Sequence, residues 1–409
     1  KDLFGINANT VAMLPIAVFA FCGVITAKDL QEIDWSVIWM VAGGFALGNA
    51  MNGTGLAENA IESIPFGAWN PVVILVIACL ICYLLSNFIS NTATAAMMLT
   101  FLTPVFKALP ANGKGRIALT MAIPVGANLG GMGTPIGTPP NVFALKYLND
   151  PTGLNIGITF SHWMMIMVPL VIVLLIIAWR MIIRFFPFTQ KTIQLDIKGE
   201  VSHNWRTVVV AATFILTIFL WVAGKNLFGI NANTVAMLPI AVFAITRVIT
   251  AKDLQDIDWS VIWMVAGGFA LGNAMNGTGL AENAIKSIPF GAWNPLIILF
   301  IACIICFILS NFISNTATAA LLVPILAVVC KGMGENLGMI GGTVTILVGI
   351  AVAASAAMSL PISTPPNAIA FSTGLIKQND MLKVGVSVGV ITLIIGISML
   401  IVIGKLGLF

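Results

Sequence analysis

The stretch LSNFISNTATAA occurs twice in the chain, at Leu85–Ala96 and again at Leu309–Ala320. Each copy follows a long apolar run, so each places a cluster of Ser, Asn and Thr at the end of a hydrophobic segment. Polar groups without partners are costly to bury in hydrocarbon. The repeated cluster therefore indicates a binding function as well as a break in the helical structure.

The composition defines the environment of the chain. Of its 409 residues, 59% are hydrophobic and 8% are charged, whereas about a quarter of the residues in soluble domains are charged. The apolar runs are about 17 to 27 residues long, which suits helices that cross a bilayer and exceeds the roughly ten-residue strands of a membrane barrel. The sequence therefore predicts an all-α polytopic membrane protein, and its net charge of +4 implies no nucleic-acid partner.

Two kinds of apolar segment are expected. The spanning helices lie near 8–26, 35–54, 116–149 (broken), 160–186, 205–223, 232–250, 259–278, 338–377 (broken) and 383–406. Two further segments, 70–108 and 294–332, each consist of two apolar arms joined at a Ser-Asn-Thr cluster. Because a polar break at mid-depth cannot face lipid, we interpret each as a re-entrant helical hairpin that enters and leaves on one side.

An internal repeat organises the chain. Residues 1–96 align with 225–320 without a gap and are nearly identical, and PIGTPPN at 135–141 returns as PISTPPN at 361–367. Five predicted crossings separate the starts of the two copies. Because five is an odd number, the two copies start on opposite sides of the membrane, and we expect an inverted repeat. Most of the 19 Lys and Arg residues fall on the side of Lys1, which the positive-inside rule makes cytoplasmic. The predicted location is the cell inner (cytoplasmic) membrane, with multiple passes.

The Ser-Asn-Thr runs at 90–92 and 314–316 stand where the second arm of each hairpin begins. Inverted repeats with broken helices place a transporter's site near the midplane. A helix that begins there presents unpaired N–H groups and a positive dipole end, which suit a carboxylate. The plainer interpretation is that these residues are only N-caps, for which Ser, Asn and Thr are preferred types.

The two TPPN motifs add oxygen ligands to this picture. A Pro pair cannot continue a helix, because each Pro lacks an N–H and clashes with the preceding turn, so backbone carbonyls are freed inside a span. Hydroxyl, amide and carbonyl oxygens suit a hard cation such as Na⁺. No ionisable residue lies in the hairpin tips or the TPPN breaks, which favours Na⁺ coupling over a proton relay. Two related clusters suit a substrate with two carboxylates.

Two CxxC spacings, Cys79/Cys82 and Cys303/Cys306, raise the alternative of a metal or redox site. Both lie inside apolar helices without His or acidic neighbours. We therefore expect these cysteines to pack as small hydrophobic side chains.

With its paired SNT hairpins and paired TPPN breaks, the chain resembles the divalent anion/sodium symporter family, and in particular its bacterial INDY-type dicarboxylate carriers. The resemblance covers essentially the whole chain. It implies Na⁺-coupled symport of C4-dicarboxylates (succinate, fumarate, malate) by an elevator mechanism, in a homodimer within the lipid bilayer. Family members are expected to have eleven spanning helices, so the chain is expected to start at the third.

The resemblance also implies a division into domains. It assigns scaffold helices to 1–55 and 205–279, interfacial arms to 56–69 and 280–292, transport-domain halves to 70–186 and 293–409, and a cytoplasmic interfacial segment to 187–204. The same resemblance assigns substrate contacts to Ser90, Asn91, Thr92, Thr138, Pro139, Ser314, Asn315, Thr316, Thr364 and Pro365. It assigns Na⁺ ligands to Ser86, Ser90, Asn91 and Gly137 at one site, and to Ser310, Ile313, Asn315 and Ser363 at the other.

Alternatives to the symporter remain open at this point. A sodium-independent dicarboxylate exchanger would keep similar motifs. An anion channel with the hairpins as its filter is a further alternative, although the two closed polar clusters are not joined by a continuous polar stripe. No nucleophile has a base partner in any hydrophobic span, so the sequence does not indicate an enzyme.

Overall fold

The computed structural model describes most of the chain between residues 69 and 250 and from 293 to 408. The described residues are 16–26, 69–87, 91–111, 113–135, 137–149, 154–193, 204–230, 232–250 and 293–408, with single positions between 28 and 56 and between 274 and 287. The predicted spans 35–54 and 259–278 and both interfacial arms are therefore described at single positions only, and most of 187–204 and Ser90 lie outside the described residues.

Helices account for all the regular structure in the described part of the chain, which confirms the predicted all-α class for these residues. Among them, α10 (Phe160–Phe185), α17 (Asn315–Met333) and α20 (Gln378–Lys405) contain stretches that are long and apolar enough to cross a membrane. α10 coincides with the span predicted at 160–186.

The apolar run at 70–108 divides into α5 (Pro71–Ser86), α6 (Asn91–Phe101) and α7 (Thr103–Ala108). α5 begins after Asn70, whose side chain accepts a hydrogen bond from the Val72 N–H at 2.9 Å, and Pro71 occupies the first turn, where its missing N–H has no cost. The break after α5 falls at the SNT cluster, as predicted. A second interruption before Pro104 was not predicted; Pro104 lacks the N–H that would continue α6.

The run at 294–332 breaks in the same way, into α16 (Pro295–Ser310) and α17. The side chain of Asn294 caps α16 as Asn70 caps α5. Ser314 caps α17, because its Oγ accepts a hydrogen bond from the Ala317 N–H at 3.1 Å. The preference of Ser for N-cap positions is therefore realised at the second tip.

Both predicted broken helices are broken, and the second segment of each begins at its Pro pair. Their segments are α8 (Lys114–Gly130) with α9 (Pro139–Leu148), and α18 (Thr343–Ala356) with α19 (Pro365–Ser372); a 3₁₀ helix (Gly334–Ile340) precedes α18. The residues just before the Pro pairs, Thr138 and Thr364, have extended backbones. Residues before Pro favour this conformation, so the chain leaves one helical segment and begins the next at a defined point.

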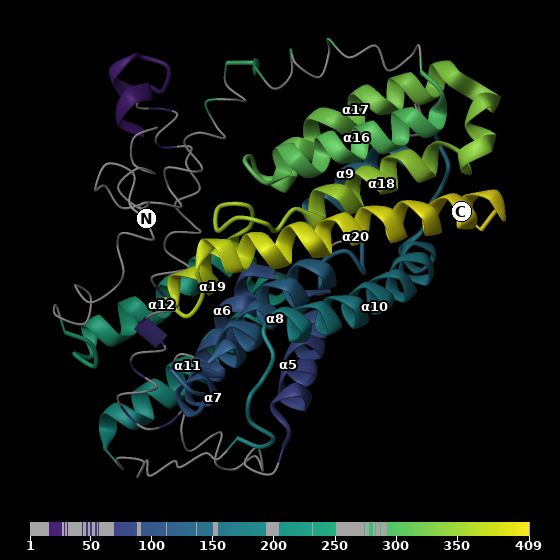
Figure 1. Cartoon of the computed structure of the whole chain (residues 1–409). Coiled ribbons are helices and arrows are strands. Elements are labelled where there is room, and N and C mark those ends of the chain that lie inside the picture. The colour runs from purple at the N-terminus through teal and green to yellow at the C-terminus, as the bar shows by residue number, and fades with distance from the viewer. Residues whose placement is uncertain are drawn as a thin grey trace.

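The short segments α9 and α19 pack against the opposite half of the molecule. α9 follows α8 in sequence but packs against α17 and α18, whereas α19 follows α18 but packs against α6 and α8. Figure 1 shows α9 beside α17 and α18, and α19 beside α6 and α8. Each half is therefore completed by a helix that the other half supplies.

α20 approaches the second break closely through glycines on one face. A Cβ atom on Gly385 would collide with the carbonyl oxygen of Met358 and the Cα of Ser359, and one on Gly389 would collide with the ring of Phe307. α20 begins at Gln378, five residues before the predicted 383, because the side chain of Asp380 accepts a hydrogen bond from the Lys377 N–H at 3.0 Å and caps the first turn.

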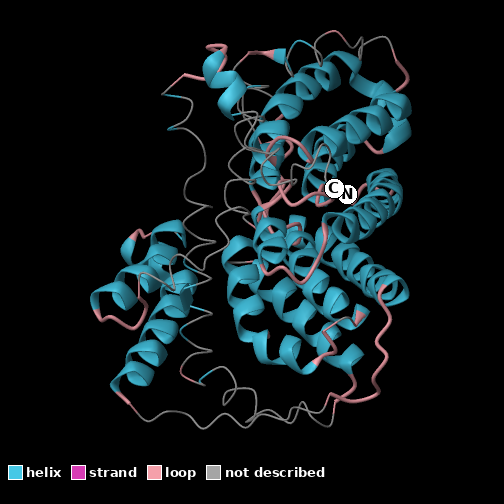
Figure 2. Ribbon diagram, turned by 60° about the vertical axis from the view of Figure 1, so that its left-hand side comes forward, coloured by secondary structure: helices cyan, strands magenta, loops and turns pink. Residues whose placement is uncertain are grey.

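The described residues form two hydrophobic cores. The larger contains the hairpin helices, the broken helices, α10 and α20. A smaller one joins α11 (Trp205–Phe228) and α12 (Ala232–Ile245) to a few positions near residue 50; its buried members are Ala46, Leu47, Ala50, Val210, Phe243 and Ile249. In Figure 2, α11 and α12 lie at one side of the main helical body.

α12 ends at Ile245, five residues before the predicted end at 250. Arg247 lies in the left-handed region, with φ of +54°, and the following N–H donates to the Phe243 carbonyl at 2.9 Å. The same turn occurs in the first copy of the repeat, where Gly23 has φ of +69° and the next N–H donates to the Phe19 carbonyl at 2.8 Å. This is the usual left-handed end of a helix, which favours Gly.

Candidate functional site

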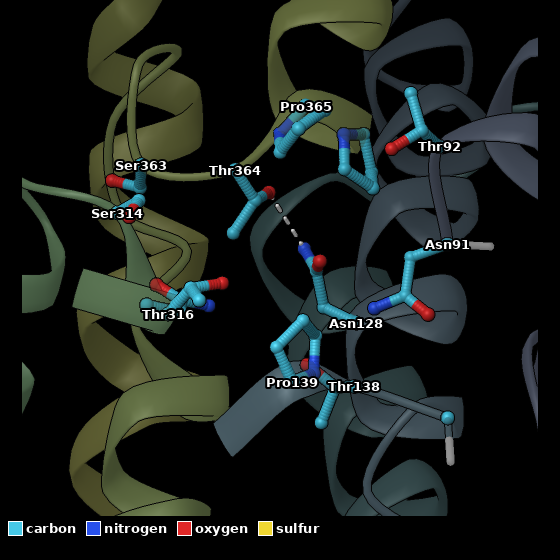
Figure 3. Close-up of a pocket in the computed structure, with 13 residues that line it drawn as sticks. Asn91, Thr92, Asn128, Thr138, Pro139, Ser314, Thr316, Ser363, Thr364 and Pro365 are labelled. Atoms are coloured by element: carbon cyan, nitrogen blue, oxygen red, sulfur yellow. Dashed lines mark hydrogen bonds between the residues drawn. The ribbon is translucent and has the colours of Figure 1, made fainter. Parts of the chain in front are cut away.

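Both hairpin tips and both Pro-containing breaks line one cavity of about 450 Å³ (Figure 3). Its lining consists of Asn91, Thr92, Asn128, Gly137, Thr138, Pro139, Ser314, Asn315, Thr316, Ser363, Thr364, Pro365 and Pro366. None of these residues is charged. The volume falls in the range of small-molecule sites.

The cavity brings together every predicted substrate-contacting residue that the structure describes; Ser90 lies outside the described residues. The predicted ion ligands divide into two groups. Asn91, Gly137, Asn315 and Ser363 line the cavity. Ser86, Ser310 and Ile313 are buried at the hairpin turns and do not line it.

Four helix N-termini converge on this cavity. α6, α9, α17 and α19 all begin with residues that line it: Asn91, Pro139, Asn315 and Pro365. Each N-terminus carries roughly half a positive charge from the aligned peptide dipoles, so four of them supply roughly +2 without any ionised side chain. The N-termini of the two hairpin helices, α6 and α17, were predicted from the sequence. The N-termini of α9 and α19 were not, because they reach the cavity only when each short helix packs against the opposite half.

At the first hairpin tip, three oxygen atoms lie close together. Ser86 Oγ is 2.5 Å from Asn91 Oδ1 and 2.8 Å from the carbonyl oxygen of Ala127. A hydroxyl has one hydrogen and can donate to only one of these acceptors at a time. The group therefore holds more oxygen lone pairs than donors, which is the chemistry of a small hard cation.

At the second tip, the equivalent atoms have no partners. Ser310 Oγ and Asn315 Oδ1 are both buried, and neither has a hydrogen-bond partner among the described residues. Buried polar atoms are normally paired, so two such oxygens at the position equivalent to Ser86 and Asn91 are again suited to a cation.

The breaks do not leave all of their carbonyls free, as the sequence reasoning assumed. The Asn of each TPPN motif caps some of them. Asn141 Nδ2 donates to the carbonyls of Gly131 and Thr134, at 3.0 and 2.8 Å. Asn367 Nδ2 donates to those of Met358 and Leu360, at 2.7 and 3.0 Å (Asn367 is 1% exposed). These structural roles of Asn were not predicted.

Further hydrogen bonds join each tip to its neighbouring break. In the second half, Asn311 Oδ1 accepts from the Ser359 N–H at 2.8 Å and lies 2.9 Å from Ser363 Oγ. In the first half, the hydroxyl of Thr134 donates to the carbonyl of Asn87 at 2.6 Å. The tips are thus held at fixed positions beside the breaks.

Close backbone contact explains Gly137 at the first break. A Cβ atom on Gly137 would lie 2.5 Å from the carbonyl oxygen of Gly131, and one on Gly131 would lie 2.8 Å from the Asn91 side chain. Gly at both positions lets the break approach the hairpin tip. In the second break Ser363 replaces Gly137, and its Oγ accepts from the Leu360 N–H at 2.9 Å, so the two breaks are not identical.

Asn128 is a cavity residue that the sequence analysis missed. It lies in α8 and is 3% exposed, and its Nδ2 donates to Thr364 Oγ1 at 3.1 Å and to Asn367 Oδ1 at 3.2 Å. The sequence feature that could have identified Asn128 is that it is a single amide side chain in a segment of otherwise apolar and small residues. Counting back equally from Asn141 and Asn367 places Ala354 at the equivalent position, so the repeat does not reveal Asn128.

The cysteines pack as expected. Cys79, Cys82, Cys303 and Cys306 are fully buried and free. A Cβ on Gly126 of α8 would lie 2.8 Å from the Cys79 sulfur, so this pair fills a close helix–helix contact.

An uncharged cavity bordered by four helix N-termini, within a strongly apolar helical body, is the arrangement of a solute-binding site in a membrane transporter. Comparison with known proteins agrees with this class. The family model described as citrate transporter (CitMHS) matches residues 3–341. The chain belongs to this family of divalent anion/sodium symporter-like proteins; it is an integral membrane transporter and not an enzyme.

Several relatives support the assignment. An uncharacterised transporter of Haemophilus influenzae is 31% identical over 94% of this chain and 85% of its own length. The sodium-dependent dicarboxylate transporter SdcS of Staphylococcus saprophyticus is 28% identical over 94% of this chain and 80% of its own. The inorganic phosphate transporter PHO87 of Saccharomyces cerevisiae is 27% identical over 88% of this chain and 39% of its own.

Among solved structures, the YdaH transporter of Alcanivorax borkumensis aligns with 94% of this chain and 90% of its own, at 12% identity and a TM-score of 0.42. Similarity at this level carries no argument about the present fold.

Proposed function

We propose that this protein is a Na⁺-coupled symporter that brings C4-dicarboxylates such as succinate, fumarate or malate into the cell. The observation that carries the proposal is the convergence of four helix N-termini on one uncharged cavity. Their combined charge of roughly +2 matches a dianion. Relatives named as sodium-dependent dicarboxylate transporters support the same substrate class.

The two ends of a dicarboxylate would meet the two tips. Thr92 and Thr316 lie in the first turns of α6 and α17, where backbone N–H groups are unpaired within the helix. Both residues line the cavity, and Figure 3 shows them on opposite sides of it. One carboxylate at each tip would place each negative charge near the dipole ends of that tip.

The two oxygen groups behind the substrate would hold Na⁺ as co-transported ions. The first consists of Ser86 and Asn91 with the Ala127 carbonyl; the second includes Ser310 and Asn315. At an effective dielectric constant of about 20, a cation about 4 Å from a carboxylate is attracted by roughly 4 kcal/mol. Sodium and substrate would therefore favour each other's binding, which is the basis of coupling.

The sodium-independent exchanger is the nearest alternative, because the charge of the helix N-termini is also compatible with it. Four dipole ends of roughly +0.5 each could offset a dianion without any metal ion. Sodium coupling is favoured by a separate observation, the unpaired buried oxygens of Ser310 and Asn315.

We infer an elevator mechanism for the movement. The transport domain would comprise 70–186 and 293–409, with inverted re-entrant hairpins, and the scaffold of a homodimer would comprise 1–55 and 205–279. The small core that joins α11 and α12 to residues near 50 supports this division, and Ile25, Val235 and Ala274 of the proposed scaffold pack in the larger core, where the two domains would meet. The inner membrane is the proposed location.

The deciding experiment is uptake of labelled succinate into proteoliposomes, with and without an inward Na⁺ gradient. Uptake that requires Na⁺ and saturates with substrate supports the proposal. Counterflow that persists in choline buffer would instead identify an exchanger, and flux that does not saturate would identify a channel. Competition by fumarate, malate, citrate and inorganic phosphate would define the substrate class, because relatives include named phosphate transporters.

A further inference from the structure

Asn128 lies near the middle of the cavity, between the two hairpin tips (Figure 3). It comes from α8 in the first half and bonds to Thr364 and Asn367 in the second half. It is 3% exposed, so its exposed surface is limited to the part that faces the cavity. A buried amide at this place acts directly on whatever the cavity holds.

The hydrogen-bond network fixes which way the Asn128 amide points. Asn367 Nδ2 is occupied by the carbonyls of Met358 and Leu360, so Asn367 Oδ1 is the atom that faces Asn128. The facing atom of Asn128 must be its Nδ2, because an oxygen there would meet another oxygen. Asn128 Oδ1 is therefore directed away from this contact, and it accepts no hydrogen bond from the described residues.

The adjacent hydroxyl of Thr364 has the opposite character. Thr364 Oγ1 accepts from Asn128 Nδ2 at 3.1 Å and from the Asn367 N–H at 3.3 Å. Since both of these contacts use the oxygen as acceptor, the hydroxyl hydrogen remains free to donate. Thr364 lines the cavity. The cavity wall therefore presents an acceptor, Asn128 Oδ1, beside a donor, the Thr364 hydroxyl.

This pair is complementary to a 2-hydroxycarboxylate, in which a donor hydroxyl stands on the carbon next to an acceptor carboxylate. We propose that Asn128 is a specificity-determining residue: its Oδ1 accepts a hydrogen bond from the 2-hydroxyl of the substrate while Thr364 donates to the neighbouring carboxylate. The inference rests on the proposed transport of dicarboxylates. It selects, within that class, hydroxylated dicarboxylates such as malate over succinate.

A hydroxyl fits Asn128 Oδ1 better than a cation does. One acceptor is enough for a hydroxyl, whereas Na⁺ needs several oxygen ligands. The oxygen groups with that character lie at Ser86 and Ser310. The equivalent position in the second half is Ala354, so the extra acceptor exists on one side only, as a substrate with a single hydroxyl requires.

The test compares ligands as competitors of labelled succinate in proteoliposomes of the full chain. The probes are succinate, malate and 2-methylsuccinate, in which a methyl group of similar size replaces the hydroxyl but cannot donate. In the wild-type protein, malate should bind about tenfold more tightly than 2-methylsuccinate. Asn128→Leu should reduce the ratio of malate affinity to succinate affinity about tenfold, while both ligands still bind.

Asn149→Leu is the matched control. Asn149 also makes two hydrogen bonds, both to the backbone of Ile158, but it does not line the cavity. If the inference holds, this change leaves the ratio of malate affinity to succinate affinity unaltered, whatever it does to stability.

The inference is overturned if Asn128→Leu leaves the ratio unchanged, or if 2-methylsuccinate competes as well as malate in the wild-type protein. The second comparison needs no variant, so it decides the matter even if Asn128→Leu does not fold. Failure of the proposed function has a different signature, since the wild-type protein would then take up no dicarboxylate at all.

Discussion

Asn141 and Asn367 perform the same task in the two breaks: the side-chain nitrogen of each donates to two backbone carbonyls that have left the helix. Replacing either Asn by Ala leaves these buried carbonyls unpaired. We expect a loss of about 1–3 kcal/mol of stability for each change, measured as thermal unfolding in detergent. Asn→Asp keeps the shape but replaces donors with acceptors, so it should be worse than Ala. An Asp variant as stable as the wild type would contradict this role.

The glycines of α20 predict a graded effect of Ala substitution. Gly385→Ala would place a methyl group against the backbone of Met358 and Ser359, which cannot yield, whereas Gly389→Ala would collide mainly with the ring of Phe307 and lie 3.3 Å from the Ala356 carbonyl oxygen. Gly385→Ala should therefore lower the melting temperature more than Gly389→Ala and reduce succinate uptake. Overpacking costs of about 1–3 kcal/mol are typical. A larger drop in melting temperature for Gly389→Ala than for Gly385→Ala would contradict the close contact of α20 with the second break.

Gly137→Ala tests the approach of the first break to the hairpin. Its Cβ would lie 2.5 Å from the Gly131 carbonyl oxygen, so the turn would have to open and separate Gly137 from Asn91. Uptake should fall at least tenfold with the protein still in the membrane. Ser363→Gly, at the equivalent position of the second break, is the comparison, because it removes a side chain where Gly137→Ala adds one. Normal uptake by Gly137→Ala would contradict the close approach.

Ser310 and Ser355 allow a test of the second sodium site, because both carry buried hydroxyls without partners among the described residues. Ser310 is the last residue of α16, at the hairpin tip, whereas Ser355 belongs to α18 and is not a predicted ion ligand. Ser310→Ala should raise the Na⁺ concentration needed for half-maximal uptake several-fold. Ser355→Ala should leave it unchanged, and neither loss of an unpaired hydroxyl should reduce stability by more than about 1 kcal/mol. Equal Na⁺ dependence in the two variants would exclude Ser310 as a ligand.

Arg247 has a left-handed backbone at the position where the first repeat has Gly23. Arg247→Gly should therefore stabilise the protein by about 1 kcal/mol, since Gly adopts this conformation without the clash of a Cβ. Arg247→Ala removes the same charge but keeps a Cβ, so it should give no such gain. Thermal unfolding of the three proteins in detergent checks the prediction. A similar rise for both variants would assign the effect to charge.

The elements that could be predicted from the sequence are those set by local chemistry. Ser-Asn-Thr clusters follow the ends of α5 and α16, and the Pro pairs begin α9 and α19, so these boundaries lie close to the expected places. The cavity-lining residues followed from the same motifs, because polar side chains in an apolar chain are few. Errors at the ends of α12 and α20 came from single residues, Arg247 and Asp380, that end or begin a helix through their own hydrogen bonds or backbone angles.

The remaining features depend on contacts between distant parts of the chain. Asn128 is separated from Thr364 by most of the protein, and its role exists only because α8 and α19 pack together. The glycines at 385 and 389 show a small-residue spacing, but the sequence does not indicate that their partner is the second break. For the same reason, the addition of α9 and α19 to the helix ends around the cavity was not foreseen.

Because α9 and α19 each pack against the opposite half, neither half of the molecule is complete without the other. A polypeptide with only one hairpin and one broken helix would lack the helix that seats beside its own hairpin, and would present its short helix to no partner. Such a half could be complete only by pairing with a second copy. Co-expressed fragments split between the repeats should therefore reassemble into one transport domain, whereas either fragment alone should not.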